Sequence, residues 1–161
     1  MFFLSFSVGN LVFRTLQMCE KYFNGQVSAD KCKPPAVFQE QLARLQADYH
    51  TIMRQCEFSV ACTEVFKLIS VMNKHIEDSK PWVLWKDKRE DDVKCFLYGL
   101  CEGIRIAALY LYPIIPHAAK DIYRQLGLPD APFSFAESLW RERGVFTIKK
   151  ESPLFPRINV D

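Results

Sequence analysis

The feature that most constrains this chain is a succession of apolar stripes whose residues recur at steps of three and four, the spacing that places side chains on one face of an α-helix. In the first segment, about 6–23, the stripe is formed by Val8, Val12, Leu16, Cys19 and Phe23. Similar segments follow at about 38–55, 58–76, 92–112 and 116–126. Amphipathic helices in succession predict an all-α fold, an antiparallel bundle of about five helices.

The helical periodicity fades beyond Gly127. We therefore expect residues 1–126 to form the bundle and residues 127–161 to form an irregular C-terminal tail that packs on it. Within the tail, Val145–Ile148 predicts a short extended piece. A chain of 161 residues is long enough to bury a single core without further support.

The charge balance limits the kind of partner. A net charge of +2 excludes a protein that coats nucleic acid by electrostatics alone, so any contact with nucleic acid must be local. No apolar run approaches the ~20 residues of a membrane span. The apolar start, Met1–Val8, has no preceding basic residue and no cleavage site after it, which argues against a signal peptide. Neither a membrane nor DNA is expected as a partner.

The six cysteines show no Cys-x-x-Cys pair and no pairing with histidine at metal-ligand spacing. Most fall at apolar helical positions. We expect buried, reduced thiols and no metal site, which favours a cytosolic (cytoplasmic) or organelle-matrix location.

Catalytic machinery is not evident in the sequence. The three histidines lie far apart, and none of the six glycines belongs to a phosphate-binding motif. The chain alone is expected to bind no cofactor and to catalyse no reaction.

Two polar features stand apart from the apolar pattern. Helical spacing gathers Asn10, Arg14, Gln17 and Lys21 on the side opposite the first stripe, although a solvated face is the ordinary explanation of such a pattern. The segment Lys80–Trp82 places a tryptophan directly after a helix-breaking proline. This tryptophan could be a loop residue that caps the bundle or a residue that binds a ligand, and the segment favours neither interpretation.

Four segments stand out by their order and spacing: Gly9–Leu16, Met72–Ile76 followed by Lys80–Trp82, Arg105–Pro116, and Pro153–Ile158. In that order and spacing, and over almost the whole chain, they resemble the anticodon-binding domain of methionyl-tRNA synthetases. Related class I enzymes share the helical bundle, but the Lys-Pro-Trp context and the terminal Leu-Phe-Pro-Arg-Ile favour methionine.

The resemblance implies roles for particular residues. Asn10 and Arg14 match the family's anticodon-reading residues, and Trp82 matches its base-stacking tryptophan, whose angle Pro81 would set. Unpaired loop bases are recognised by stacking on aromatic rings and by bonding their exposed edges. Together these residues would read the CAU anticodon of methionine tRNA.

The family usually has asparagine where this chain has Phe13, which is expected to pack against a neighbouring helix, although a stacking role is open. Asn73 is expected to bond a neighbouring helix's backbone or to brace the Trp82 loop. Trp85 is assigned to packing unless it proves exposed beside Trp82.

By the same resemblance, the partners are the anticodon stem-loop of methionine tRNA and a catalytic domain of the parent polypeptide, where ATP and Mg would act. Residues 153–158 resemble the segment that returns toward that domain. Cations at Lys80, Lys86, Lys88 and Arg89 could contact phosphates, although a solvated charge run is the default.

Two alternatives stay open: a protein-interaction module that no longer reads RNA, which burial of Arg14 and Trp82 would favour, and the anticodon domain of another class I synthetase.

Overall fold

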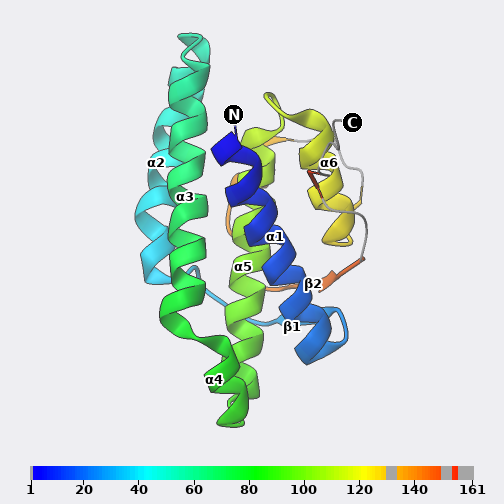
Figure 1. Ribbon diagram of the computed structural model, residues 1–161. Helices are drawn as coiled ribbons and strands as arrows, with labels where there is room; N and C mark the ends of the chain where they lie inside the picture. The colour runs from blue at the N-terminus through cyan, green and yellow to red at the C-terminus, as the bar shows by residue number, and fades with distance from the viewer. Residues whose placement is uncertain (1, 130–133, 150–153, 156–161) are drawn as a thin grey trace, which may run out of the picture.

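The computed structural model describes residues 2–129, 134–149 and 154–155. In chain order, the elements of this part are α1 (Phe2–Phe23), β1 (Gln26–Ala29), α2 (Ala36–Arg54), α3 (Phe58–Ser79), α4 (Pro81–Lys86), α5 (Glu90–Leu111), α6 (Pro116–Gln125), a 3-10 helix η1 (Phe135–Ser138) and β2 (Gly144–Thr147). The predicted all-α bundle is confirmed: within the described residues it consists of five helices of ten residues or more, and α4 is a sixth, short one (Figure 1).

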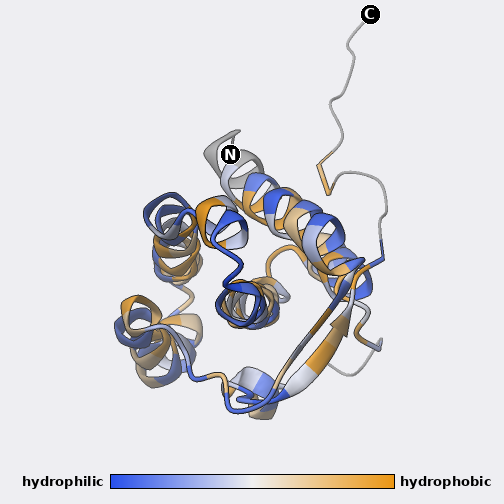
Figure 2. Ribbon diagram, turned by 90° about the horizontal axis from the view of Figure 1, so that it is seen from below, coloured by the Kyte–Doolittle hydropathy of each residue, from blue (hydrophilic) through white to orange (hydrophobic). Residues whose placement is uncertain are grey.

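Helix α5 forms the centre of the bundle. Every residue from Leu97 to Leu111 is buried, and Figure 2 shows the other elements arranged around one helix. The hairpin of α2 and α3 covers one side, and α1 lies across α5 beside α3 (Figure 1). The predicted stripe of α1 faces inward, since Val8, Val12, Leu16 and Cys19 are buried. The opposite face of α1 is therefore left to solvent.

Three elements were not predicted: α4, β1 and the short 3-10 helix η1. Residues 81–86 form α4 because Lys80 adopts a left-handed conformation, φ 45°, which ends α3 and lets Pro81 occupy the first turn of a new helix. Strand β1 lies in a stretch that reads as turn-rich, and it pairs antiparallel with β2, Val27 opposite Phe146. The extended piece expected at Val145–Ile148 is confirmed as β2, but its partner is too distant in sequence for a local pattern to indicate.

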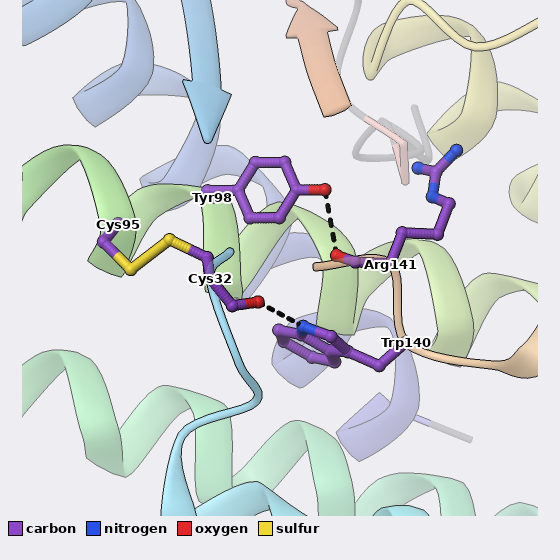
Figure 3. Close-up of a disulfide and its surroundings, with 5 residues drawn as sticks. All are labelled: Cys32, Cys95, Tyr98, Trp140 and Arg141. Carbon is purple, nitrogen blue, oxygen red and sulfur yellow. Dashed lines mark hydrogen bonds between the residues drawn. A yellow bond between two sulfur atoms is a disulfide. The ribbon is translucent and has the colours of Figure 1, made fainter. Parts of the chain in front are cut away.

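The expectation that all cysteines are reduced is wrong for Cys32 and Cys95. They form a disulfide, with a Cα–Cα distance of 6.1 Å (Figure 3). The bond joins the segment after β1 to the first half of α5, and the separation of 63 positions between the two cysteines hides the pairing from the sequence. Cys19 and Cys101 are free and buried, Cys62 is free and half-buried, and Cys56 is free and exposed. The cytosolic or organelle-matrix location stays a prediction.

Hydrogen bonds from both sides of this disulfide, the segment after β1 and helix α5, hold the chain that follows η1. The Trp140 Nε1–H donates to the Cys32 carbonyl oxygen over 2.8 Å, and the Tyr98 hydroxyl donates to the Arg141 carbonyl oxygen over 3.0 Å (Figure 3). The Cys32 backbone N–H donates to the Glu142 carbonyl oxygen over 2.7 Å. Part of the predicted irregular tail is thus held against the bundle by specific contacts.

A buried ion network anchors the tail to α5. Glu102 is fully buried and pairs with Arg105 at 2.6 Å and with Arg141 at 3.0 Å. The Arg105 guanidinium also donates to the carbonyl oxygens of Glu137 and Leu139. Burial alone would raise the pKa of the Glu102 carboxyl, but the hydrogen bonds and charges of the two arginines outweigh it and hold the pKa below its usual range.

The segment 153–158, expected to resemble a return strand, lies outside the described residues except for Leu154 and Phe155. These two side chains are partly buried against the core. Among the described residues, no helix combines the length and the apolarity that a membrane crossing requires. No cluster of three or more potential metal ligands is found in that same part of the chain.

Candidate functional site

A surface pocket of about 280 Å³ lies between α1 and α4. It is lined by Arg14, Gln17, Met18, Lys21, Tyr22 and Trp82. Two of the three principal site residues from the sequence analysis, Arg14 and Trp82, are therefore brought together although they lie on different helices. The lining combines two cations, an amide, a thioether and two aromatic rings, which suits a flat, polar-edged ligand with negative charge.

Helix α1 supplies most of the lining because its apolar face is committed to the core. Arg14, Gln17 and Lys21 follow at steps of three and four, so they project from the same side of the helix. Gln17 and Lys21 are exposed and Arg14 is half-buried.

An ion pair across two helices positions Arg14. Its Nη2 atom lies 2.6 Å from Glu77 Oε1 on α3, and the Arg14 side chain is 28% exposed. The guanidinium carries five N–H donors in a planar fork, so one contact with Glu77 leaves donors for a ligand.

Trp82 reaches the pocket because α4 begins at Pro81. Pro81 is buried and occupies the first turn of α4, where the fixed φ of proline suits a helix and its missing N–H costs nothing. Trp82 follows with 37% of its surface exposed. That Pro81 sets the angle of the Trp82 ring stays a prediction.

Asn10 does not line the pocket. It is exposed on α1, one helical turn before Arg14. The structure thus places Asn10 on the same face as Arg14, beyond the edge of the pocket.

The expectation that Phe13 packs against a neighbouring helix is wrong. Phe13 is 54% exposed. Helix α3 contacts α1 on the side where Arg14 meets Glu77, and Phe13 precedes Arg14 by one residue, which turns it about 100° away on the helix.

Trp85 packs as expected and supports one wall of the pocket. Its ring stacks on Tyr22, with centroids 4.7 Å apart, and meets Phe23 edge-on at 5.5 Å. Tyr22 in turn lines the pocket, so the packing of Trp85 connects α4 firmly to the last turns of α1.

Asn73 makes the expected contact with a neighbouring helix's backbone. Its Nδ2 donates to the Ser7 carbonyl oxygen of α1 over 3.4 Å and to the Ile69 carbonyl oxygen of its own helix over 3.2 Å. It therefore supports the placement of α1 on α3, and within the described residues it makes no hydrogen bond to Arg14 or Trp82.

The cations around α4 lie outside the pocket lining. Lys80, Lys86 and Lys88 are exposed, and Arg89 pairs with Asp92 at 2.7 Å. A solvated charge run, the default interpretation of this segment, accounts for them.

Glu77, Met18 and Tyr22 were missed by sequence reasoning. Met18 and Tyr22 border the apolar stripe of α1, so they read as core residues. Glu77 follows Asn73 by four residues on the same face of α3, and that spacing was the one local signal that it would face α1.

The family model described as the anticodon-binding domain of tRNA ligase matches residues 37–153. This range contains Trp82 but begins after α1, so Asn10 and Arg14 lie outside it.

Individual relatives extend the similarity over α1. The chain is 33% identical over 165 residues to a methionine–tRNA ligase of Bacillus subtilis, covering 98% of this chain and 25% of the relative. It is 34% identical over 167 residues to that of Halalkalibacterium halodurans, with the same coverage. The apo crystal structure of Mycobacterium tuberculosis methionyl-tRNA synthetase superimposes with a TM-score of 0.80 at 27% identity, covering 96% of this chain and 32% of that one. The chain thus spans about a quarter of the length of these curated relatives.

Proposed function

This chain belongs to the anticodon-binding domains of tRNA ligases, of the kind found in methionyl-tRNA synthetases, and from that membership we propose that it binds the anticodon stem-loop of methionine tRNA and reads its CAU anticodon. The observation that carries the proposal is the meeting of Arg14 and Trp82 in one open pocket. Both side chains remain accessible, which speaks against the alternative of a protein-interaction module that has lost its RNA site.

The chemistry of the pocket suits an unpaired base. Trp82, partly exposed in the pocket, would offer a stacking surface, and such stacking contributes roughly 1–3 kcal/mol per base and discriminates little between bases. Discrimination must therefore come from hydrogen bonds to the base edge. Arg14, paired with Glu77 and lining the same pocket as Trp82, would use its remaining donors for the edge of a base stacked on Trp82, and Asn10 would offer both a donor and an acceptor to a neighbouring base.

The parent polypeptide would carry the chemistry. We propose that a catalytic domain elsewhere in that polypeptide uses ATP and Mg to attach methionine to the tRNA that this domain has docked. The chain itself is proposed to hold no cofactor and to catalyse nothing. The other open alternative, a different class I synthetase, is not favoured, because the relatives named above are enzymes for methionine.

Binding of short RNA stem-loops tests the proposal directly. The 161-residue chain is titrated with stem-loops that differ only at the three anticodon positions, at one fixed salt concentration. We expect the CAU stem-loop to bind more tightly than each altered one, by a factor of about five or more per changed base, the lower end for a base-edge contact. Equal affinity for all of them would refute the reading of the anticodon.

A further inference from the structure

The pocket continues past Arg14 along α1, where the sequence analysis assigned no role. Gln17 and Lys21 line this part. Within the described residues, neither side chain makes a hydrogen bond or an ion pair, and the Lys21 Nζ atom lies 5.3 Å from the centre of the Tyr22 ring. Both functional groups are thus available to a ligand.

The two cations of the pocket differ in their surroundings. The Arg14 charge is partly neutralised by Glu77 at 2.6 Å, whereas Lys21 has no carboxylate partner in the part of the chain that the structure describes. A lysine ammonium acts as a compact point charge and binds phosphate without demanding a planar geometry. Lys21 is therefore the better placed of the two for a backbone phosphate.

Gln17 lies between these two cations on the same helix face. Its amide both donates and accepts, which matches a base edge where a donor lies beside an acceptor. Trp82 forms the opposite side of the pocket on α4. The Gln17 amide, the Trp82 ring and the Lys21 ammonium thus line a single pocket. A nucleotide offers a partner for each of them: a base edge, a base face and a phosphate.

We propose that Gln17 bonds the edge of a base held on Trp82, and that Lys21 binds the backbone phosphate beside that base. This inference rests on the proposed function and deepens it. It adds a residue that contributes to selectivity and a residue that contributes affinity regardless of sequence.

Two variants separate these roles in stem-loop titrations over a range of salt concentrations. Lys21→Gln should weaken binding by the same factor for every anticodon, and should reduce the slope of log affinity against log salt by about 0.7, the value for one phosphate contact on a single strand. Gln17→Met should weaken CAU binding at least about fivefold and altered anticodons less, with the salt slope unchanged.

Matched controls come from exposed residues outside the pocket. Lys120→Gln on α6 removes the same charge, and Gln46→Met on α2 removes the same amide. If Lys21→Gln behaves like Lys120→Gln, the phosphate contact is refuted. If Gln17→Met behaves like Gln46→Met, or weakens all anticodons equally, the base contact is refuted.

The same titrations distinguish this inference from the proposed function. A wild-type chain that prefers CAU, together with Gln17 and Lys21 variants equal to their controls, overturns the inference alone. A wild-type chain without any preference for CAU overturns the proposed function, and the inference with it.

Discussion

At the scale of single residues, exposure separates the side chains available to a ligand from those that build the bundle. Trp82 and Trp85 lie three residues apart on α4, yet Trp82 lines the pocket while Trp85 packs on Tyr22. The same helix therefore uses one indole for its own attachment and leaves the other open.

Replacement of Trp82 should affect binding without affecting the fold. Trp82→Ala is expected to weaken CAU stem-loop binding by roughly 1–3 kcal/mol, the contribution of one stacked base. The helical circular dichroism should stay unchanged, because Trp82 is already 37% exposed. Loss of helical signal together with binding would assign Trp82 a structural role instead.

Glu102 should show the opposite behaviour. Glu102→Gln leaves Arg105 buried without its carboxylate and is expected to reduce the free energy of unfolding by roughly 3–5 kcal/mol at neutral pH. The exposed pair of Glu40 and Arg44 provides the control, and Glu40→Gln should cost less than about 1 kcal/mol.

The pH dependence of the Glu102 effect has a defined sign. Because its pKa is lower in the folded chain than in the unfolded one, the stabilisation is complete above the unfolded value of about 4.3 and is lost as the pH falls through the lowered folded value. In urea titrations, the difference between wild type and Glu102→Gln should therefore narrow only in strong acid. A difference that shrinks already between pH 7 and 5 would contradict this.

At the scale of elements, local periodicity was enough to predict the five long helices, because helix formation depends on contacts within a few residues. It was not enough for α4, which has only six residues and depends on the left-handed Lys80, nor for β1, whose partner is β2. The residues of the site likewise divide into those that the sequence indicated and those that it did not. Resemblance indicated Arg14 and Trp82, but the contributions of Glu77 and Tyr22 follow only from how α1, α3 and α4 meet.

The end of α6 depends on a glycine. Gly127 has φ +71°, and a Cβ there would lie 2.1 Å from the Thr147 carbonyl oxygen of β2. Gly127→Ala should destabilise the protein by at least about 2 kcal/mol in thermal or urea unfolding, because a left-handed alanine is strained and β2 must also move.

Gly99 offers a contrast within α5. A Cβ at that position would make ordinary contacts, 3.6 Å from the ring of Pro35. Since alanine favours a helix over glycine by about 1 kcal/mol, Gly99→Ala should leave stability unchanged or slightly increased. Similar losses in both variants would contradict this account of Gly127.

At the scale of the whole molecule, the disulfide joins two regions that the sequence separates. In the chain-entropy account, closing a loop of 63 residues stabilises the folded state by about 4 kcal/mol. Cys95→Ser should lower the free energy of unfolding by a comparable amount, whereas Cys56→Ser, at an exposed free thiol, should have little effect.

Thiol counting checks the bond itself. In denaturant without reductant, four cysteines should react with a thiol reagent, and six should react after reduction. Six reactive thiols from the start would show that Cys32 and Cys95 are not bonded.

The pairing of β1 with β2 also determines the order in which the elements can fold while the polypeptide is being synthesised. Helices α1 to α3 can form as they emerge, because their hydrogen bonds are local. Strand β1 must wait with its edge facing water until residues 144–147 have been made, and only then does Phe146 cover the core beside Val27. A nascent chain interrupted within α6 would thus contain nearly all of its helices but would still lack β2, whose pairing with β1 covers the core beside α5.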